Sequence, residues 1–581
     1  MRSPAASFRA CSRCRRSLRV FLPEPFKRAP LCPLRGQQRR ANTTSSQARP
    51  PTAPKAYLDI KHIRQNPGLY EQNCIDRNYA TLSQYPWRII KLHEQWLNMQ
   101  RGEGRRLRER SNKIRRLLKL GTGRGRTNGQ NTEDASAGEE EARTREELLQ
   151  EAKALKVELA RVEELEKGIQ DEIGRLAWEL PNLTSGHTPL GETPTVLGHI
   201  NEQLGTKLRQ QETLSSPSFS ADPSTLLGGT SRSHTAISAH LNNVLDFPAG
   251  ARTSGWGFYF LRSAAALLEQ ALIQYALQEA MARGFVPVSP PSLVYAHIAE
   301  ASGFRPRDQS GETQIYSVGD VDGGNNGEGG GSSGKTPPLV LAGTAEIPLA
   351  GMLAGQTVRP ESLPLKMVGV SRCYRAEAGA RGAETKGLYR VHEFTKVELF
   401  GWAMPPTADE SSASADGNFD TSASRSSSIQ AQTPAEAIFA DILSLQSHIL
   451  TSLNLHARLL ELPSADLGAS ATRKLDHEAY FPSRAAAGLS TFPSSQEHLG
   501  WGELTSASLC TDYQARRLGA RVKLADGSLV FLHSVNGTAC AVPRVLAALI
   551  EQGWDADRGM IWVPECLRVW MRGREWVGEH L

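Results

Sequence analysis

The sequence predicts an α+β fold in which a helical hairpin precedes a larger mixed domain. Residues 155–180 carry apolar side chains at alternating steps of three and four, which is the coiled-coil period. From about residue 230, an amphipathic helix is followed by short β-like runs separated by turns, an order typical of α+β domains. The chain has 581 residues, enough for two or three domains.

Residues 1–50 have the composition of a mitochondrial transit peptide that runs into a linker. They hold eleven Arg and one Lys against one Glu, a net charge of +11, so the rest of the chain sums to −5 of the overall +6. An ordinary basic tail is the alternative interpretation. The composition predicts the mitochondrial matrix as location. Overall charge does not indicate nucleic-acid binding, which has to be argued locally.

The remaining composition narrows the class of protein further. The chain lacks a run of about 18 apolar residues, so we expect no membrane span. Cys11 and Cys14 form a CxxC within the predicted transit peptide, without a second pair at zinc spacing. The other six cysteines are scattered, as free thiols are in a reducing compartment. We therefore expect neither a disulfide framework nor structural zinc.

An antiparallel helical hairpin is predicted within residues 56–195. Apolar residues run from Ile89 to Leu117 in its first helix, which Gly102 and Gly104 weaken. A polar connection follows this helix, and Pro181 ends the second. The apolar series of the second helix is Leu155, Leu159, Val162, Leu165, Ile169, Ile173, Leu176 and Leu180.

The first helix is basic where it nears the tip. Between Arg101 and Lys119 there are nine Lys or Arg and two Glu. A solvated helix face is one interpretation, and a surface that follows a phosphate backbone is the other. The candidates for such a surface are Arg105, Arg106, Arg108, Lys113, Arg115 and Arg116, with Arg124 and Arg126 in the tip.

Residues 230–581 form the predicted α+β domain. Residues 263–283 predict an amphipathic helix with a Ser as candidate cap and Gly284 as its stop. Two low-complexity inserts interrupt the domain near 318–336 and 405–432, and we expect surface loops there.

Three local clusters could carry chemistry. In CYRAEAG…GLYRVHEFTKVELF, residues 373–400, cations on strand-like runs suit a polyphosphate and Phe394 offers a stacking surface for a base. LAGTAEIPL places Glu346 in an apolar run, where a carboxylate needs a partner such as a ligand ammonium. In HSVNGTACAVPRVL, a turn leads into a helix that bears Arg544. Taken singly, each is compatible with ordinary structure: a salt-bridged surface hairpin, a loop at a strand end and a helix-surface cation.

The order TAEIPL, CYRAEAG…GLYRVHEFTKVE, DYQARR and NGTACAVPR closely resembles seryl-tRNA synthetases of the bacterial and organellar type. The resemblance opens at AYLDIKHIRQNP, includes ELPNLTSGHTPLG after the hairpin and ends at VPECLRVWM. It covers residues 56–581 apart from the inserts. Several separate motifs in the right order are far more specific than any one of them.

The resemblance implies a class II catalytic domain with an antiparallel six-stranded sheet and flanking helices, preceded by a coiled-coil arm. The predicted helix 263–283 and the following GFVPVSPPSLV, which contains Pro291, resemble motif 1 of the class. In the family, motif 1 builds a dimer interface. Motif 2 is CYRAE to VELF, and motif 3 is NGTACAVPR. The implied activity is formation of seryl-adenylate from L-serine and ATP, then transfer of serine to tRNA(Ser), whose long variable arm the hairpin grips. A homodimer and Mg²⁺ are implied as well.

The resemblance also implies site residues. Arg375, Glu503 and Arg544 are the implied catalytic residues, and Glu503 and Ser506 the implied magnesium ligands. The implied ATP contacts are Arg375 at the α-phosphate, Ala376, Glu377 at the adenine amino group, Phe394 stacked on adenine, Glu503, Leu504, Thr505, Ser506 and Arg544. The implied serine contacts are Thr344, Ala345, Glu346, Arg375, Glu398, Asn536 and Thr538.

The sequence departs from the family at three points. Thr538 stands where Ser is frequent, which keeps the hydroxyl and adds a methyl group. Pro543 replaces a frequent Gly, and a helix tolerates proline in its first turn. Leu504 and Thr505 replace Ile and Ser. None of these changes removes a required functional group.

Three other hypotheses remain open. A synthetase-like protein without catalysis is disfavoured by the retained charges at Arg375, Glu377, Glu398, Glu503 and Arg544. A purely structural coiled-coil protein is disfavoured by the large domain after the hairpin. Another class II specificity is possible, and the loop from Thr344 to Glu346 is the feature that discriminates.

Overall fold

A computed structural model describes residues 50, 53–120, 144–214, 232–304, 314–318, 337–377, 387–406, 433–490 and 498–578. All of them belong to the compact unit Ala48–Leu581. The predicted transit peptide with Cys11 and Cys14, the tip with Arg124 and Arg126, and nearly all of the two predicted inserts lie outside these residues. Within the described ranges, no helix could cross a membrane. The cysteines described there are free: Cys74, Cys373, Cys510, Cys540 and Cys566.

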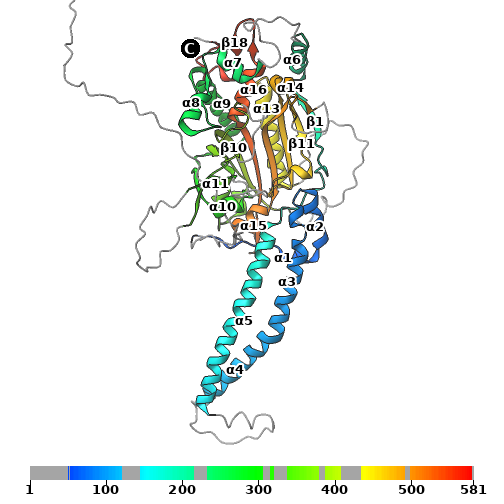
Figure 1. Ribbon diagram of the computed structural model, residues 1–581, viewed down its shortest axis with the longest axis vertical. Coiled ribbons are helices and arrows are strands. Elements are labelled where there is room, and N and C mark those ends of the chain that lie inside the picture. Colours follow the sequence, from blue (N-terminus) through cyan, green and yellow to red (C-terminus); the bar gives the residue numbers. More distant parts are fainter. Residues whose placement is uncertain are drawn as a thin grey trace, which may run out of the picture. The chain divides into compact units, whose positions relative to one another are not determined.

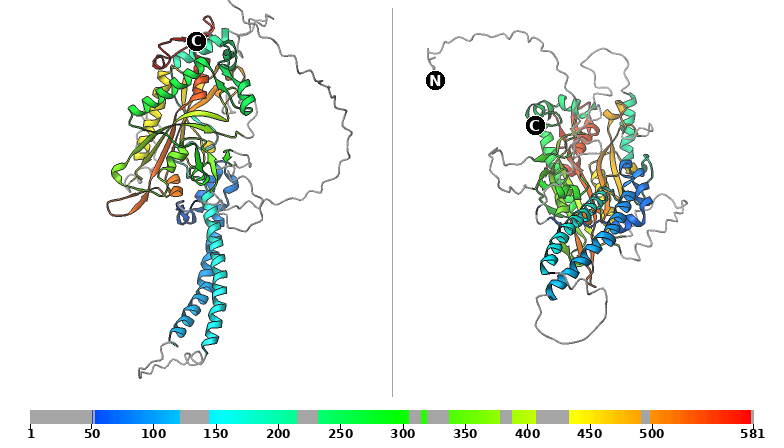
Figure 2. Two further views of the ribbon diagram at one scale, coloured as in Figure 1. Left: turned by 90° about the vertical axis from the view of Figure 1, so that its left-hand side faces the viewer. Right: turned by 60° about the horizontal axis from the view of Figure 1, so that its bottom comes forward.

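Two helical segments lie side by side and form the predicted antiparallel hairpin, the arm (Figures 1 and 2). The first consists of α3 (Tyr85–Met99), a π-helical turn (Gln100–Gly104) and α4 (Arg105–Leu120); the second is α5 (Arg145–Glu179). A capping box at Thr144 begins α5, and Leu180 leaves the helix in extended conformation before Pro181. At the base, the short helices α1 (Ile60–Gln65) and α2 (Pro67–Asp76) add Ile63 and Cys74 to the hydrophobic contacts of α3 and α5.

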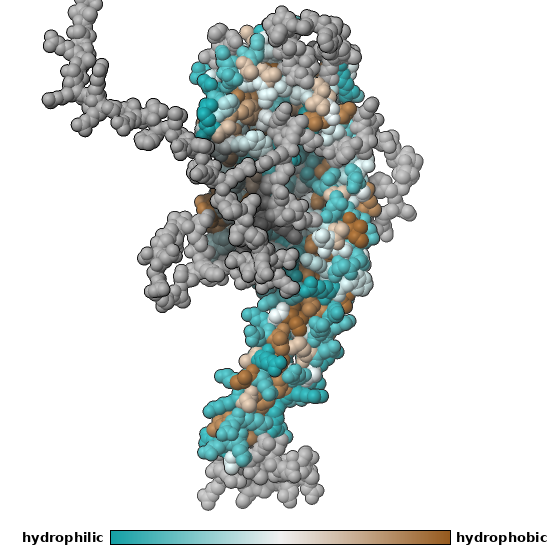
Figure 3. Space-filling model, in the orientation of Figure 1, coloured by the Kyte–Doolittle hydropathy of each residue, from teal (hydrophilic) through white to brown (hydrophobic). Residues whose placement is uncertain are grey.

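The arm is held by a heptad seam with one polar position. Figure 3 shows hydrophobic residues between the two helices and hydrophilic residues around them. The assignment of Leu165 to the seam is wrong, because its side chain is 50% exposed, whereas Glu166 is only 8% exposed. Position 166 continues the seven-residue step from 159 to 173 and 180. Arg108 Nη2 lies 2.8 Å from Glu166 Oε2, which compensates the buried charge.

Gly102 and Gly104, predicted to weaken the first helix, lie in the π-helical turn that separates α3 from α4. A Cβ on Gly104 would lie 3.0 Å from both the Arg108 guanidinium and the Glu166 carboxylate. The glycine thus leaves room for the ion pair between the helices.

An eight-stranded sheet, in the order β1-β11-β12-β13-β16-β10-β9-β4, forms the centre of the second domain. The expected six antiparallel strands run from β11 to β9, and two short edge strands extend them: β1 pairs antiparallel with β11, and β4 parallel with β9. The sheet therefore has eight strands, not six. The bounds are β1 Thr195–Ile200, β4 Val286–Val288, β9 Leu365–Tyr374, β10 Glu393–Ala403, β11 Ala457–Glu461, β12 Arg473–Tyr480, β13 Trp501–Thr511 and β16 His533–Ala541.

Three long helices pack on one face of this sheet and bury the main core: α9 (Ser263–Ala282), α13 (Pro434–Ser452) and α16 (Val542–Gln552). Odd-numbered residues of β10, such as Val397 and Leu399, point into this core. Gly284 follows α9 with φ +79°, as its predicted stop requires. The predicted Ser cap is wrong, because Ser263 is already the first helical residue and the preceding Arg262 makes no side-chain capping bond.

Smaller elements surround the sheet. A second hydrophobic cluster joins α10, α11 and α15 to Phe400 and Trp402 of β10, beside the site described below. The further helices are α6 (Glu202–Leu214), α7 (His234–His240), α8 (Phe247–Ser254), α10 (Ala296–Ala301), α11 (Glu346–Gly351), α14 (Pro482–Ala486) and α15 (Tyr513–Leu518). The short strands are β2 Leu245–Asp246, β3 Phe260–Leu261, β5 Leu293–Tyr295, β6 Ser317–Val318, β7 Leu339–Leu341, β8 Thr357–Val358, β14 Arg521–Lys523, β15 Leu529–Phe531, β17 Trp554–Asp555, β18 Met560–Trp562 and β19 Trp576–Val577.

A buried arginine ties the base of the arm to the sheet domain. Arg77 is 1% exposed and donates hydrogen bonds to the carbonyl oxygens of Asn182, Gly468 and Ala471. Burial lowers the pKa of Arg77 to about 10. Arg517 adds bonds to the carbonyls of Trp178 and Leu180 at the end of the second arm helix. Two arginines that donate to backbone carbonyls thus contribute to this joint, where burial makes the loss of a hydrogen bond costly.

Candidate active site

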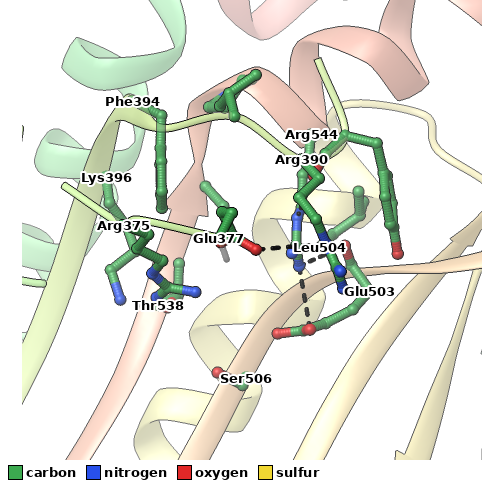
Figure 4. A pocket seen from close by; sticks show the side chains of 14 residues that line it. Arg375, Glu377, Arg390, Phe394, Lys396, Glu503, Leu504, Ser506, Thr538 and Arg544 are labelled. Carbon is green, nitrogen blue, oxygen red and sulfur yellow. Dashed lines mark hydrogen bonds and ion pairs between the residues drawn. The ribbon is translucent and has the colours of Figure 1, made fainter. Parts of the chain in front are cut away.

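The motif 2 hairpin supplies one wall of a pocket on the sheet face away from α9 and α13, next to the first turn of α16. Strands β9 and β10 pair in register from Tyr374 and Glu393 to Leu365 and Trp402. Arg375 follows β9 directly, and its guanidinium carbon lies 5.3 Å from the centre of the Phe394 ring. Glu377, with φ +45°, directs its carboxylate toward Arg390, 3.5 Å away. Figure 4 shows these side chains converging.

The opposite wall comes from β13 and α16. A register shift in the pairing of β12 with β13 falls between the partners of Thr505 and Glu503. Glu503 and Ser506 consequently share the pocket face although they are an odd number of positions, three, apart in the strand. Arg544 Nη1 lies 3.0 Å from Glu503 Oε2, as the dashed line in Figure 4 marks. Burial alone would raise the pKa of Glu503, but Arg544 and Lys474 outweigh burial and hold that pKa at about 2.

A buried ion pair lies at the other end of the pocket. Lys396 Nζ is 2.6 Å from Glu398 Oε2, and both side chains are at most 8% exposed. Thr538, opposite Glu398 in the ladder of β10 and β16, donates to the same oxygen at 3.2 Å. Burial raises the pKa of Glu398 despite the nearby ammonium. The threonine methyl group is accommodated, since Thr538 lines the pocket and keeps this bond.

Glu346 lies beyond this pair, at the start of α11. Its Oε1 accepts hydrogen bonds from Gln514 at 2.7 Å and from Asn536 at 2.8 Å. Burial, followed by repulsion from Glu398, raises the pKa of Glu346 to about 8. The carboxyl group is therefore largely protonated at neutral pH, and a bound ammonium would favour its ionised form. Thr344 is buried as well, and its hydroxyl accepts from the Glu346 amide at 3.4 Å.

The structure separates the predicted residues into three groups. The pocket is lined by Arg375, Glu377, Phe394, Glu503, Leu504, Ser506, Thr538 and Arg544. The hydrogen bonds and charges around Glu346 join Thr344, Asn536 and Glu398 into an adjoining group. Ala345, Ala376 and Thr505 are not among the pocket lining; Thr505 stands opposite His477, on the face of β12 that bonds to α13.

The site also contains Tyr389, Lys396 and Gln514, none of which received an individual role from the sequence. Tyr389 lines the pocket, with its ring centre 4.9 Å from the Arg544 guanidinium and 4.5 Å from that of Arg484. Lys396 neutralises Glu398. Gln514 lies within the motif DYQARR, and it donates a hydrogen bond to Glu346. This contact between distant segments could not be predicted from the motif itself.

The residues expected to hold Mg²⁺ fit that ion. Mg²⁺ uses one or two carboxylates and leaves its other positions to phosphate and water. Glu503 and Ser506 present a carboxylate and a hydroxyl on one face, and Asp476 stands opposite Ser506 in the strand pairing. Asp476 is buried, and its Oδ1 has no hydrogen-bond partner among the described residues. Lys474 bonds to its other oxygen at 3.0 Å.

The basic residues predicted on the arm differ in their surroundings. Arg105, Arg106, Lys113, Arg115 and Arg116 are exposed on α4. Arg108 is partly buried in its ion pair with Glu166. Arg105 pairs with Glu109 one helical turn along, at 2.7 Å.

Residues 335–416 and 423–553, which contain this pocket, match the family described as tRNA synthetase class II core domain (G, H, P, S and T). The chain therefore has the catalytic core of a class II aminoacyl-tRNA synthetase: an antiparallel sheet covered by helices on one face, with Arg375, Glu503 and Arg544 in the pocket on the other.

Relatives identify the family within this class. The chain is 32% identical over 521 residues to a serine–tRNA ligase of Rubrobacter xylanophilus, which covers 90% of this chain and 99% of that one. It is 39% identical over 338 residues to a mitochondrial serine–tRNA ligase of Saccharomyces cerevisiae, covering 58% of this chain and 63% of that relative. The chain belongs to the serine–tRNA ligase family. The crystal structure of seryl-tRNA synthetase from Pyrococcus horikoshii complexed with ATP is similar with a TM-score of 0.66 and 27% identity, covering 90% of this chain and 99% of that one.

Proposed function

We propose that the chain activates L-serine with ATP and transfers it to tRNA(Ser) in the mitochondrial matrix. The observation that carries this proposal is the junction of two sites on one sheet face: cations around Arg375 and Arg544, and buried carboxylates at Glu346 and Glu398. A nucleoside triphosphate needs the first, and an amino acid with a free ammonium group needs the second.

The first half-reaction is the in-line attack of the serine carboxylate on the α-phosphorus of ATP, with pyrophosphate as leaving group. This step needs positioning and charge neutralisation more than a strong base. Arg375 would contact the α-phosphate, Phe394 would stack on adenine, and Glu377 would accept from the adenine amino group. Arg544, held by Glu503 on one side, would cover the other side of the nucleotide. Bound Mg²⁺, held by Glu503 and Ser506, would neutralise phosphate charge.

Selection of serine follows from the buried polar groups. Glu346 and Glu398 would hold the ammonium end, with Thr344 and Asn536 beside them and Thr538 nearest the hydroxyl. A site built to bond a hydroxyl disfavours alanine because its own groups would be left unpaired, and a closed pocket disfavours the larger threonine. In the second half-reaction, the ribose hydroxyl of the tRNA attacks the serine carbonyl and AMP leaves.

The arm would select the tRNA through its phosphate backbone. The exposed residues Arg105, Arg106, Lys113, Arg115 and Arg116 make α4 strongly basic, and contacts of such residues with a phosphate backbone recognise shape. Arg108 contributes less to it than the sequence suggests, because Glu166 already pairs with it. A homodimer through the motif 1 region, with Pro291, and import directed by residues 1–50 complete the proposal.

Charging of a serine tRNA transcript by the purified full chain tests the proposal. The expected result is serine attached to a transcript with its long variable arm and much less to one with that arm removed. Serine-dependent pyrophosphate exchange without charging of any tRNA would refute the transfer step. Binding of tRNA without either reaction would favour the non-catalytic alternative.

A further inference from the structure

A buried hydrogen-bond network lies behind the adenylation pocket and involves no residue to which a role has been given. Its centre is Glu551 of α16, whose side chain is fully buried. Glu551 Oε1 accepts from the backbone amide of His234 at 3.1 Å, from His234 Nδ1 at 2.7 Å and from the Ser483 hydroxyl at 2.8 Å. Its Oε2 accepts from the Ser483 amide at 3.2 Å. The network therefore joins α7, α14 and α16.

The second ring nitrogen of His234 faces the motif 2 hairpin. His234 Nε2 accepts the backbone N–H of Leu388 at 3.0 Å. Because Nε2 is an acceptor, the ring proton of the neutral imidazole is on Nδ1, where it is donated to Glu551. The approach is close: a Cβ on Gly387, which has φ +72°, would lie 2.0 Å from His234 Nε2. Position 387 thus requires glycine both for its backbone conformation and for access of the imidazole.

Leu388 leads directly to the pocket. The carbonyl oxygen of the next residue, Tyr389, accepts from Arg544 Nε at 3.1 Å, and the tyrosine ring lies 4.9 Å from the arginine guanidinium. A Cβ on Gly502 would lie 2.8 Å from the Tyr389 ring, so β13 closes on this ring from the other side. The orientation of Arg544, which also pairs with Glu503, therefore depends on where the backbone of 388–389 is held.

We propose that His234 is a positioning residue for ATP: by holding the Leu388 amide, it places Tyr389 and, through Tyr389, the guanidinium of Arg544. The proposal rests on the proposed role of Arg544 at the nucleotide. His234 is buried and is not among the residues that line the pocket, which distinguishes its proposed action from that of the lining residues. The serine end, around Glu346 and Glu398, shares no hydrogen bond with this network among those found in the described part of the chain.

Two substitutions separate the halves of the imidazole. In His234→Asn, the amide NH₂ can replace Nδ1–H toward Glu551, but the side chain is too short to reach Leu388. In His234→Gln, the longer side chain can place its carbonyl oxygen near the position of Nε2 and accept the Leu388 N–H. Gly387→Ala disturbs the same contact from the other side. His477→Asn is a matched control, since His477 is also a buried histidine but bonds to Ser447 on the α13 face of the sheet.

The assay is serine-dependent pyrophosphate exchange by the full chain, with ATP and serine varied separately. For His234→Asn and Gly387→Ala, the expected result is a KM for ATP raised about tenfold, or about 1.4 kcal/mol, with the KM for serine nearly unchanged. His234→Gln should recover most of the loss, and His477→Asn should leave both constants near those of the unaltered chain. Equilibrium binding of ATP, measured calorimetrically on the same proteins, should follow the same order.

Two outcomes would overturn the proposal. One is an unchanged ATP affinity in both His234→Asn and Gly387→Ala. The other is a loss in which both KM values shift alike, His234→Gln gives no rescue, and activity falls in proportion to the folded fraction, as expected of a merely structural residue. Absence of exchange in the unaltered chain would instead refute the proposed function, and the calorimetric comparison would still decide the role of His234.

Discussion

Replacement of Arg77 by methionine should loosen the joint between the arm and the sheet domain. Methionine keeps much of the volume but removes three hydrogen bonds donated by a charged group. The carbonyls of Asn182 and Gly468 keep a second bond, from Asn73 Nδ2 and from the Ala471 amide, whereas the Ala471 carbonyl loses the donor found for it. A hydrogen bond to a charged group contributes about 1.5–3 kcal/mol, so the loss of three costs on the order of 4–9 kcal/mol. Removing a buried cation recovers part of this, because burial disfavours the charge and lowers the pKa of Arg77 to about 10.

We therefore expect a net loss of about 3 kcal/mol in the free energy of unfolding and a thermal midpoint lower by roughly 5 °C. No hydrogen bond found among the described residues joins Arg77 to Arg375 or Arg544, so serine-dependent pyrophosphate exchange should be retained while tRNA charging falls. Calorimetric unfolding and the two activity assays on the same preparation measure both effects. Arg77→Lys, which can keep one of the bonds, is the intermediate control. Unchanged stability together with unchanged charging in Arg77→Met would refute the reasoning about this joint.

Three other predictions concern the serine site and the basic residues of the arm. Thr538→Val removes the hydroxyl that donates to Glu398, so it should lower kcat/KM for serine by about 10–100-fold and leave the KM for ATP nearly constant. Thr538→Ser keeps the hydroxyl and should stay close to the unaltered chain. Equal losses in both variants would contradict the role of the hydroxyl. The double variant Arg115→Ala with Arg116→Ala should weaken tRNA binding and reduce the salt dependence of that binding, while pyrophosphate exchange stays unaffected. Arg108→Ala should mainly lower stability, because Arg108 pairs with Glu166. Filter binding of tRNA at several salt concentrations distinguishes the two kinds of variant. Burial and Glu398 raise the pKa of Glu346 to about 8, so serine affinity should increase as pH rises from 6.5 to 8.5. In Glu346→Gln, the KM for serine measured over the same pH range should no longer show this dependence.

The same raised pKa affects stability in the opposite sense. The folded-state pKa of Glu346 lies above its ordinary value of 4.5, so the folded chain retains a proton there that the unfolded chain releases. This contribution is fully present below about pH 4.5 and is lost as pH rises through about 8. Serine, by supplying an ammonium group, should offset the loss, which a thermal-shift series with and without serine can measure.

Local pattern predicted the elements of the arm well and its details less well. The heptad step located α5 and its end at Pro181, because a coiled-coil seam repeats within the helix itself. It misplaced Leu165, since hydrophobicity alone cannot indicate that a carboxylate occupies the seam when an arginine from the other helix pairs with it. Likewise, serine is a residue type that often caps helices, but Ser263 is the first residue of α9 and Arg262 occupies the cap position.

Site residues were predicted where the residues that lie together in the pocket also lie within one sequence motif. Arg375, Glu377 and Phe394 lie on one hairpin, and the structure brings them to the same pocket as Arg544. Contacts between distant segments could not be read from the chain. Gln514 reaches Glu346 from a separate helix, and a register shift in β13 decides that Ser506 faces the pocket whereas Thr505 does not. The run that contains β4 was predicted as β-like, but the expected six-stranded sheet included neither β4 nor β1, because these edge strands are short and gain their stability from their neighbours.

Pyrophosphate exchange into ATP by the full chain, with serine, threonine and alanine compared in parallel, tests the central claim most directly. The account predicts exchange with serine, far less with threonine or alanine, and its loss in Arg375→Ala, because the proposed role of that side chain is to provide the cation beside the α-phosphate. Exchange with none of the three amino acids, from correctly folded protein that binds ATP, would contradict the account.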